Sequence, residues 1–153
     1  MKASELLLRL KIDMKHYESK VRHDNNCLNR NYMSIKCIMS NYNLKNFNEI
    51  LSLSPEGLDY EINDEELRDL ENRIDHYFKL YAPDDEEFKK FTKIISIYLT
   101  FIAEKPLHPP GIEFSDGTRV HKEGYIYYCT GKKLHLKEDY SLCKYCVARN
   151  SNP

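Results

Sequence analysis

Apolar residues recur every three or four positions along the first two thirds of the chain, which is the period of an amphipathic α-helix. The pattern predicts helices over residues 3–22, 28–42, 46–53, 63–81 and 85–104. The last of these is the most apolar, so we expect it at the centre of a helical bundle.

Polar residues at three positions predict where helices begin. Ser4 is a plausible N-cap for the first helix. Asn63 followed by Glu66 has the spacing of a capping box, in which each side chain satisfies a free backbone N–H of the first turn. Asp84 followed by Glu87 repeats that spacing before the most apolar helix.

The pattern changes after residue 105. Three prolines fall within residues 106–110, where a helix cannot continue. Residues 118–121 and 125–128 are rich in β-branched and aromatic side chains, and residues 122–124 between them predict a hairpin turn with glycine in the left-handed position. A short last helix is expected to begin near Leu142.

The composition narrows the possible partners and location of the protein but does not indicate a function. Of 153 residues, 41% are apolar and 31% are charged, and the net charge of −1 gives no overall electrostatic case for a nucleic acid or a membrane. The charge is nevertheless uneven, because residues 59–75 and 84–87 are acidic and residues 119–149 lean basic. No signal peptide or spanning segment is visible, so a cytoplasmic location with reduced thiols is expected.

Three of the five cysteines lie close together near the end of the chain. Cys143 and Cys146 form a C-x-x-C, and Cys129 precedes Cys143 at the end of the predicted second strand. Thiolates from a strand and from a short helix can share one metal ion, and the spacing favours zinc. The alternative is that all three are ordinary core residues without a metal.

A histidine is the expected fourth ligand. We rank His108 first because neighbouring prolines already fix its loop, then His121 on the predicted hairpin, then His135 between the cysteines. Cys27 and Cys37 have no C-x-x-C partner, so they are expected to be buried thiols rather than ligands of an iron–sulfur cluster.

An enzymatic alternative rests on carboxylates near the cysteines. Glu113, Asp116 and Glu123 would be the candidate bases of a metal-dependent hydrolase that activates a metal-bound water. His121-Lys122-Glu123 also echoes the H-x-E of zinc deaminases, but Leu142 replaces their proline and the predicted hairpin replaces their helix.

Tyrosine and basic residues in the tail offer a surface for a partner, either a protein or a nucleic acid. Small zinc modules use such side chains to stack on bases and to contact phosphates. The plainer interpretation is that the hairpin tyrosines pack against the helices. The tyrosines concerned are Tyr125, Tyr127, Tyr128, Tyr140 and Tyr145.

Three stretches of the tail, L-H-P-P-G-I-E-F at 107–114, G-Y-I-Y-Y-C at 124–129 and L-C-K-Y-C-V-A-R at 142–149, resemble a family of uncharacterised proteins of methanogenic archaea. The chain departs from the family's pattern at 115–117 and 130–132 but keeps the three cysteines and His108. The resemblance therefore implies His108 as the fourth ligand and an archaeal source, and it implies no activity.

We therefore predict a mainly α fold: a bundle of four to five helices over residues 1–105, with a small β-hairpin module over residues 106–153 that a Cys-rich zinc site staples. The expected function is a zinc-stabilised binding or interaction module, with a metal-dependent hydrolase as the alternative.

Overall fold

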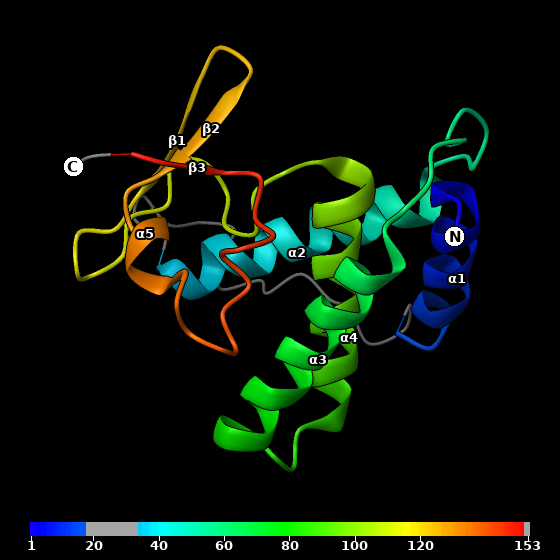
Figure 1. The fold of residues 1–153 in the computed structure, drawn as a ribbon, viewed down its shortest axis with the longest axis horizontal. Helices are drawn as coiled ribbons and strands as arrows, with labels where there is room; N and C mark the ends of the chain where they lie inside the picture. Colours follow the sequence, from blue (N-terminus) through cyan, green and yellow to red (C-terminus); the bar gives the residue numbers. More distant parts are fainter. Residues whose placement is uncertain (18–33, 152–153) are drawn as a thin grey trace.

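The computed structural model describes residues 1–17 and 34–151 and is mainly helical, as predicted. Four helices dominate the described residues, and the fourth continues into a six-residue π-helix, η2 (Figure 1). Their bounds are α1 (Ala3–Lys15), α2 (Ile35–Ser52), α3 (Asp64–Tyr81), α4 (Glu86–Ile97) and η2 (Tyr98–Ala103).

Helix α2 corrects the predicted break between residues 28–42 and 46–53, because one helix runs through the described part of both. The residue that was expected to open a new helix instead supports the existing one. The side chain of Asn46 is fully buried, and its Nδ2 donates to the carbonyl of Tyr42 one turn earlier at 2.8 Å. Predictions on residues 18–33 lie outside the described residues.

The predicted cap at Asn63 is confirmed, because its side chain accepts the backbone N–H groups of Glu65 and Glu66 at 3.0 and 3.2 Å. The other two helix starts were predicted slightly wrongly. Helix α1 has Lys2 rather than Ser4 as its N-cap residue, and helix α4 is capped by Asp85 rather than Asp84.

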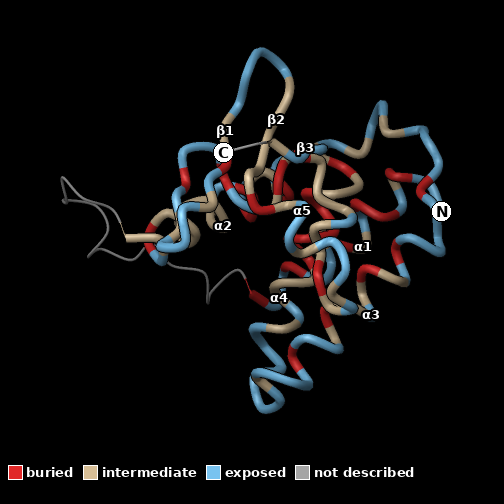
Figure 2. Tube along the Cα trace, turned by 60° about the vertical axis from the view of Figure 1, so that its left-hand side comes forward, coloured by how far each residue is buried: buried red, intermediate tan, exposed pale blue. Residues whose placement is uncertain are grey.

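The core lies where α1 meets α2, α3, α4 and η2, and there the buried positions gather while the far end of the α3–α4 pair is exposed (Figure 2). Helices α3 and α4 lie side by side, as capped neighbours joined by a short loop should. Within the described residues, no helix has both the length and the apolarity needed to cross a membrane. Fully buried side chains of the core include Leu6, Leu7, Leu10, Met14, Ile50, Leu70 and Leu99.

The π-helix ends the bundle and delivers the chain to the tail. Its last backbone bond runs from the Lys105 N–H to the Leu99 carbonyl at 3.0 Å, across Glu104, whose φ of 52° is left-handed. The Glu49 carboxylate on α2 holds both sides of this turn, because it accepts from Tyr98 Oη at 3.1 Å and from Lys105 Nζ at 2.7 Å.

The tail contains a small three-stranded sheet and one short helix. Strands β1 (Val120–Glu123) and β2 (Ile126–Cys129) pair antiparallel, and β3 (Arg149–Asn150) adds to β2 in parallel, so that the order is β1-β2-β3. Helix α5 (Lys132–His135) lies between β2 and β3 in the sequence.

The predicted hairpin therefore exists, with its first strand two residues later than expected. The loop residues are Gly124 and Tyr125, and Gly124 has the positive φ, 62°, that such two-residue loops need. The expected last helix near Leu142 is only a turn, in which the Leu142 carbonyl accepts the N–H groups of Tyr145 and Cys146. Helix α5 was not predicted.

A polar clamp joins the tail to helix α3. The guanidinium of Arg73 donates from Nη1 to the carbonyls of Glu138 and Ser141, at 3.2 and 3.0 Å. It also donates from Nε to the carboxylate of Asp69 at 3.0 Å, and that carboxylate accepts the hydroxyl of Tyr145. One turn of α3 therefore fixes the loop that carries the C-x-x-C.

We predict that Arg73→Ala destabilises the protein by about 2 kcal/mol, because two carbonyls lose a charged donor in a part-buried setting. Chemical denaturation followed by circular dichroism measures the change. Arg68→Ala, on an exposed position of the same helix, is the control and should change stability by less than about 0.5 kcal/mol. Equal effects of the two substitutions would contradict the clamp.

Candidate metal centre

Two separate segments carry the three cysteines of the tail. Cys129 ends strand β2, opposite Asn150 of β3. Cys143 and Cys146 lie in the turn closed by the Leu142 carbonyl, and the Cys143 N–H donates to Ser141 Oγ at 3.1 Å. All three are half-buried free cysteines.

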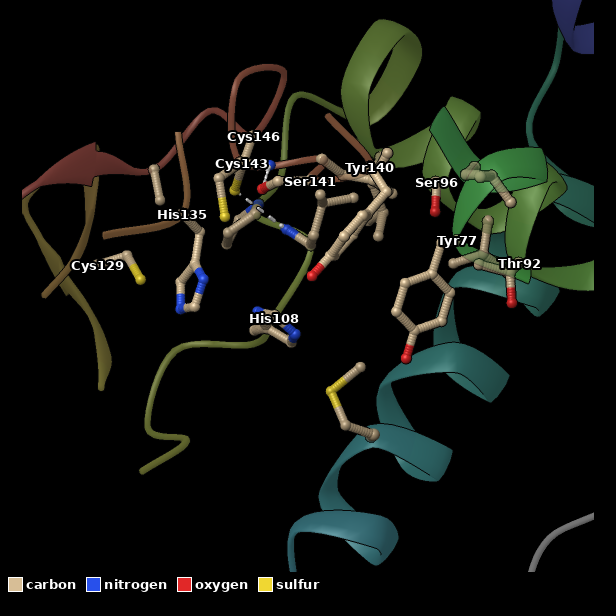
Figure 3. Close-up of a pocket in the computed structure, with 18 of the residues that line it drawn as sticks. Tyr77, Thr92, Ser96, His108, Cys129, His135, Tyr140, Ser141, Cys143 and Cys146 are labelled. Atoms are coloured by element: carbon tan, nitrogen blue, oxygen red, sulfur yellow. Dashed lines mark hydrogen bonds between the residues drawn. The ribbon is translucent and has the colours of Figure 1, made fainter. Parts of the chain in front are cut away.

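These cysteines line one end of a cavity of about 430 Å³, together with His108 and His135. In Figure 3 the imidazole of His135 is seen between Cys129 on one side and Cys143 with Cys146 on the other. The remaining wall comes from helices of the bundle and is largely apolar; its residues include Met39, Ile74, Phe78, Phe91, Ile95 and Leu99.

The side chains at this end do not form a finished ligand set. Across residues 1–17 and 34–151, no three His, Cys, Asp or Glu side chains are placed closely enough to hold a metal ion. The structure thus places the predicted ligands around one cavity, and the binding of a metal ion by them stays a prediction.

The electrostatics at this end disfavour charged thiolates in the absence of a cation. Burial raises the pKa of the Cys143 thiol, and the neighbouring Cys146 and Cys129 raise it further. Cys146 has a donor of its own, because the Leu107 N–H lies 3.4 Å from its Sγ.

His108, the first-ranked histidine, lies in the proline loop and lines the same cavity, near His135 in Figure 3. Its ring meets Phe114 edge-on, with 5.1 Å between the ring centroids. The surface of His108 is exposed to solvent, yet protein atoms crowd the rest of the residue. The resulting desolvation of the imidazole, with a smaller contribution from His135, lowers the pKa of His108. A neutral imidazole is the form that binds metals.

His121, ranked second from the sequence, does not line the cavity. It lies on β1 opposite Tyr128, stacks on that ring at 5.3 Å, and has its Nε2 3.4 Å from Glu123 Oε1. The H-x-E pattern of the deaminase alternative therefore forms a pair on the hairpin, away from the cysteines.

His135, ranked last from the sequence, lines the cavity and has a carboxylate partner. Its Nδ1 lies 3.2 Å from Glu138 Oε1, three residues later. The i, i+3 spacing of a histidine and a glutamate is visible in the sequence and could have raised its rank, because such pairs face each other on a helical turn.

The candidate bases of the hydrolase alternative also lie elsewhere. Glu113 forms an isolated bridge with Arg119, and the Asp116 carboxylate accepts the Thr118 N–H at 2.8 Å. Neither of them lines the cavity, and nor does Glu123.

Close packing fixes helix α5 beside the cysteine turn. Lys132 Nζ donates to the carbonyls of Cys146 and Ala148, each at 2.7 Å. Gly131 is needed for space, because a Cβ there would lie 2.5 Å from Cγ2 of Thr118. The α5 backbone is thus tied to the segment that carries the C-x-x-C.

The prediction for Cys37 was partly wrong. Its side chain is buried, as expected, but its sulfur is in a disulfide rather than a free thiol. Cys27 lies outside the described residues.

The Asp69 carboxylate makes the clamp sensitive to acid. The hydrogen bond from Tyr145, followed by that from Arg73, lowers the pKa of Asp69, while burial, with Asp69 as a second cause, raises the pKa of Tyr145 to about 12. A carboxyl group with a lowered pKa stabilises the fold above its ordinary value of about 3.9, and this contribution is lost as the pH falls through the lowered pKa.

We therefore predict that Asp69→Asn destabilises the protein at pH 7 and that its deficit relative to wild type shrinks as the pH falls below about 4. Urea unfolding between pH 7 and pH 2.5 measures both curves. Asp59→Asn, at an exposed loop position, is the matched control and should follow wild type throughout. A deficit for Asp69→Asn that does not change with pH would contradict the ionic part of the clamp.

Comparison with known proteins matches the sequence of this chain to a protein family. The family model described as an uncharacterized protein conserved in archaea (DUF2115) matches residues 4–151. No solved structure matches the chain.

The curated relatives come from methanogens. A UPF0305 protein of Methanocaldococcus jannaschii is 37% identical over 161 residues, which cover 98% of this chain and 97% of the relative. Shorter matches include a UPF0305 protein of Methanothermobacter thermautotrophicus, 39% identical over 40% of this chain and 37% of the relative. A UPF0305 protein of Methanococcus maripaludis is 32% identical over 61% of this chain and 57% of the relative.

Proposed function

This chain belongs to the DUF2115 family of uncharacterised archaeal proteins, and we propose that it is a non-enzymatic binding protein whose tail is held together by one zinc ion. The observation that carries the proposal is that Cys129, Cys143 and Cys146 line one cavity together with two histidines, His135 and His108, the latter being the one predicted from the sequence. The proposed ligands are these three thiolates and one imidazole.

The donor set fits zinc in chemical terms. Three sulfurs and one neutral imidazole nitrogen are a common set for a closed, tetrahedral structural site. Three thiolates in a half-buried site repel one another, and a divalent cation removes that cost, so metal binding and deprotonation support each other. Each cysteine sulfur can be re-aimed by rotation about a single bond, without movement of the backbone.

A structural metal would also stabilise the tail, which has a small apolar core. Its buried apolar residues are few, chiefly Ile112, Val120 and Ala148, and its strand β3 has two residues. A small module with so little core commonly needs a metal or other cross-link to be stable. The carboxylates proposed as bases lie away from the cysteines, which favours binding over hydrolysis as the function.

We predict one zinc ion per purified chain by elemental analysis and its loss in Cys143→Ser. Removal of the metal with a chelator should speed hydrogen exchange at the β2 and β3 amides while α1, α3 and α4 stay protected, because the metal links segments of the tail only. His121→Ala removes a possible metal ligand of the tail that does not line the cavity, so it is the control and should keep its zinc. A wild-type protein that contains no zinc and still has an ordered tail would contradict the proposal.

The tail also presents a surface for an anionic partner. Hairpin β1–β2 projects from the body of the protein (Figure 1), and Tyr125 in its loop is 97% exposed. Lys122 Nζ lies 5.2 Å from the centre of the Tyr127 ring on the same hairpin. Residues 119–149 contain seven basic and three acidic residues.

Exposed tyrosines beside lysines are the side chains that bind single-stranded nucleic acids, through base stacking and phosphate contacts. We therefore propose single-stranded nucleic acid as the partner of this hairpin. An acidic protein partner would use the charges but would not need the stacking of Tyr125.

We predict that zinc-loaded protein binds single-stranded RNA or DNA oligonucleotides with an affinity that falls as salt rises. Tyr125→Ala should weaken binding about tenfold, since stacking on one base contributes about 1–3 kcal/mol. Lys122→Glu should weaken binding as well, whereas Lys79→Glu, at the end of α3, is the matched control and should leave it unchanged. Fluorescence anisotropy measures each affinity, and equal affinities for wild type and both hairpin variants would exclude this surface.

A further inference from the structure

His135 and Glu138 form a pair whose geometry is already set by the backbone. Helix α5 ends at His135, and the Glu138 N–H donates to the His135 carbonyl at 3.2 Å, so the two residues sit on one turn. Their side chains meet with 3.2 Å between Nδ1 and Oε1. The imidazole is therefore oriented by a carboxylate.

The carboxylate determines which ring nitrogen is available. When Nδ1 carries the proton that it shares with Glu138, Nε2 is the nitrogen with a free lone pair. His135 lines the same end of the cavity as the three cysteines and is seen between them in Figure 3. Histidines that bind metals commonly donate their other N–H to a carboxylate, which fixes the ring and makes it a stronger ligand.

His108 lacks this support. Its ring meets that of Phe114, and within residues 1–17 and 34–151 no hydrogen bond orients its imidazole. Both histidines line the cavity. Of these two, His135 is the one whose ring is oriented by a hydrogen-bonding partner among the described residues.

Helix α3 also holds the pair in place. The carbonyl of Glu138 accepts from Arg73 Nη1, so the clamp fixes the residue that orients His135. Lys132, at the other end of α5, donates to the Cys146 carbonyl and ties the same turn to the C-x-x-C. The geometry of His135 relative to Cys146 is therefore fixed from both ends of α5.

We infer that His135, through Nε2, is the fourth zinc ligand in place of His108, and that Glu138 is its positioning residue. This inference rests on the proposed zinc site and revises one member of its ligand set. It makes the site a Cys₃His centre built entirely from the segment between Cys129 and Cys146.

The test compares zinc and cobalt(II) binding by wild type and by single variants. His135→Ala should lower the zinc affinity by more than 100-fold and weaken the visible absorption bands of tetrahedral cobalt. Glu138→Gln, which keeps the shape and loses the charge, should lower the zinc affinity about 10- to 100-fold, as is typical for an outer-shell partner. His108→Ala should leave the affinity and the cobalt spectrum close to wild type.

A second measurement needs no variant. Long-range proton–nitrogen NMR of the zinc-loaded wild type identifies which histidine binds the metal and through which nitrogen, and we expect His135 Nε2. Metal on His108, or an unchanged affinity in His135→Ala, would overturn the inference while leaving the zinc proposal intact. A wild-type protein that binds neither metal would refute the zinc proposal itself, so the two failures are distinguishable.

Discussion

The position of the tail depends on one side chain of helix α3. Arg73 donates to two main-chain carbonyls, those of Glu138 and Ser141, and so it fixes the path of the backbone rather than the placement of a single side chain. Asp69 directs that guanidinium and also accepts Tyr145, which lies between the two cysteines of the C-x-x-C turn. A planar donor with several N–H groups is suited to this task, because it can satisfy separate acceptors at once.

This dependence explains why the tail is attached by polar contacts. Only a few of its side chains, among them Leu107, Leu142 and Tyr145, pack against the bundle core, and they are only partly buried. Hydrophobic burial on this scale cannot by itself order a segment of more than 40 residues. Directional bonds to the main chain supply specificity, and the proposed zinc ion would supply the cross-link that the small sheet lacks.

The bundle could be predicted from the sequence because its signals are local. The period of apolar residues and the Asn63 cap act within one or two turns, so α3 was predicted to within a residue at each end. The break before Asn46 was wrong because a buried asparagine can bond its own helix instead of ending it. The short helix of the tail was not predicted because it depends on contacts between residues far apart in the sequence. Helix α5 is too short to be stable alone, and the bonds of Lys132 to distant carbonyls support it. The shared cavity of the cysteines followed from their spacing, and the choice of histidine stays a prediction.

Charge connects the proposed metal to the proposed partner. The basic excess of residues 119–149 lies in the same segment as the three cysteines. A zinc ion neutralises most of the charge of the thiolates that it binds, so the module keeps a positive surface while it gains a cross-link. Because helix α3 carries six acidic and three basic residues, the proposed anionic partner would be repelled there and directed to the hairpin. The division of charge between bundle and tail is therefore the electrostatic basis of the nucleic-acid surface that we propose on the hairpin.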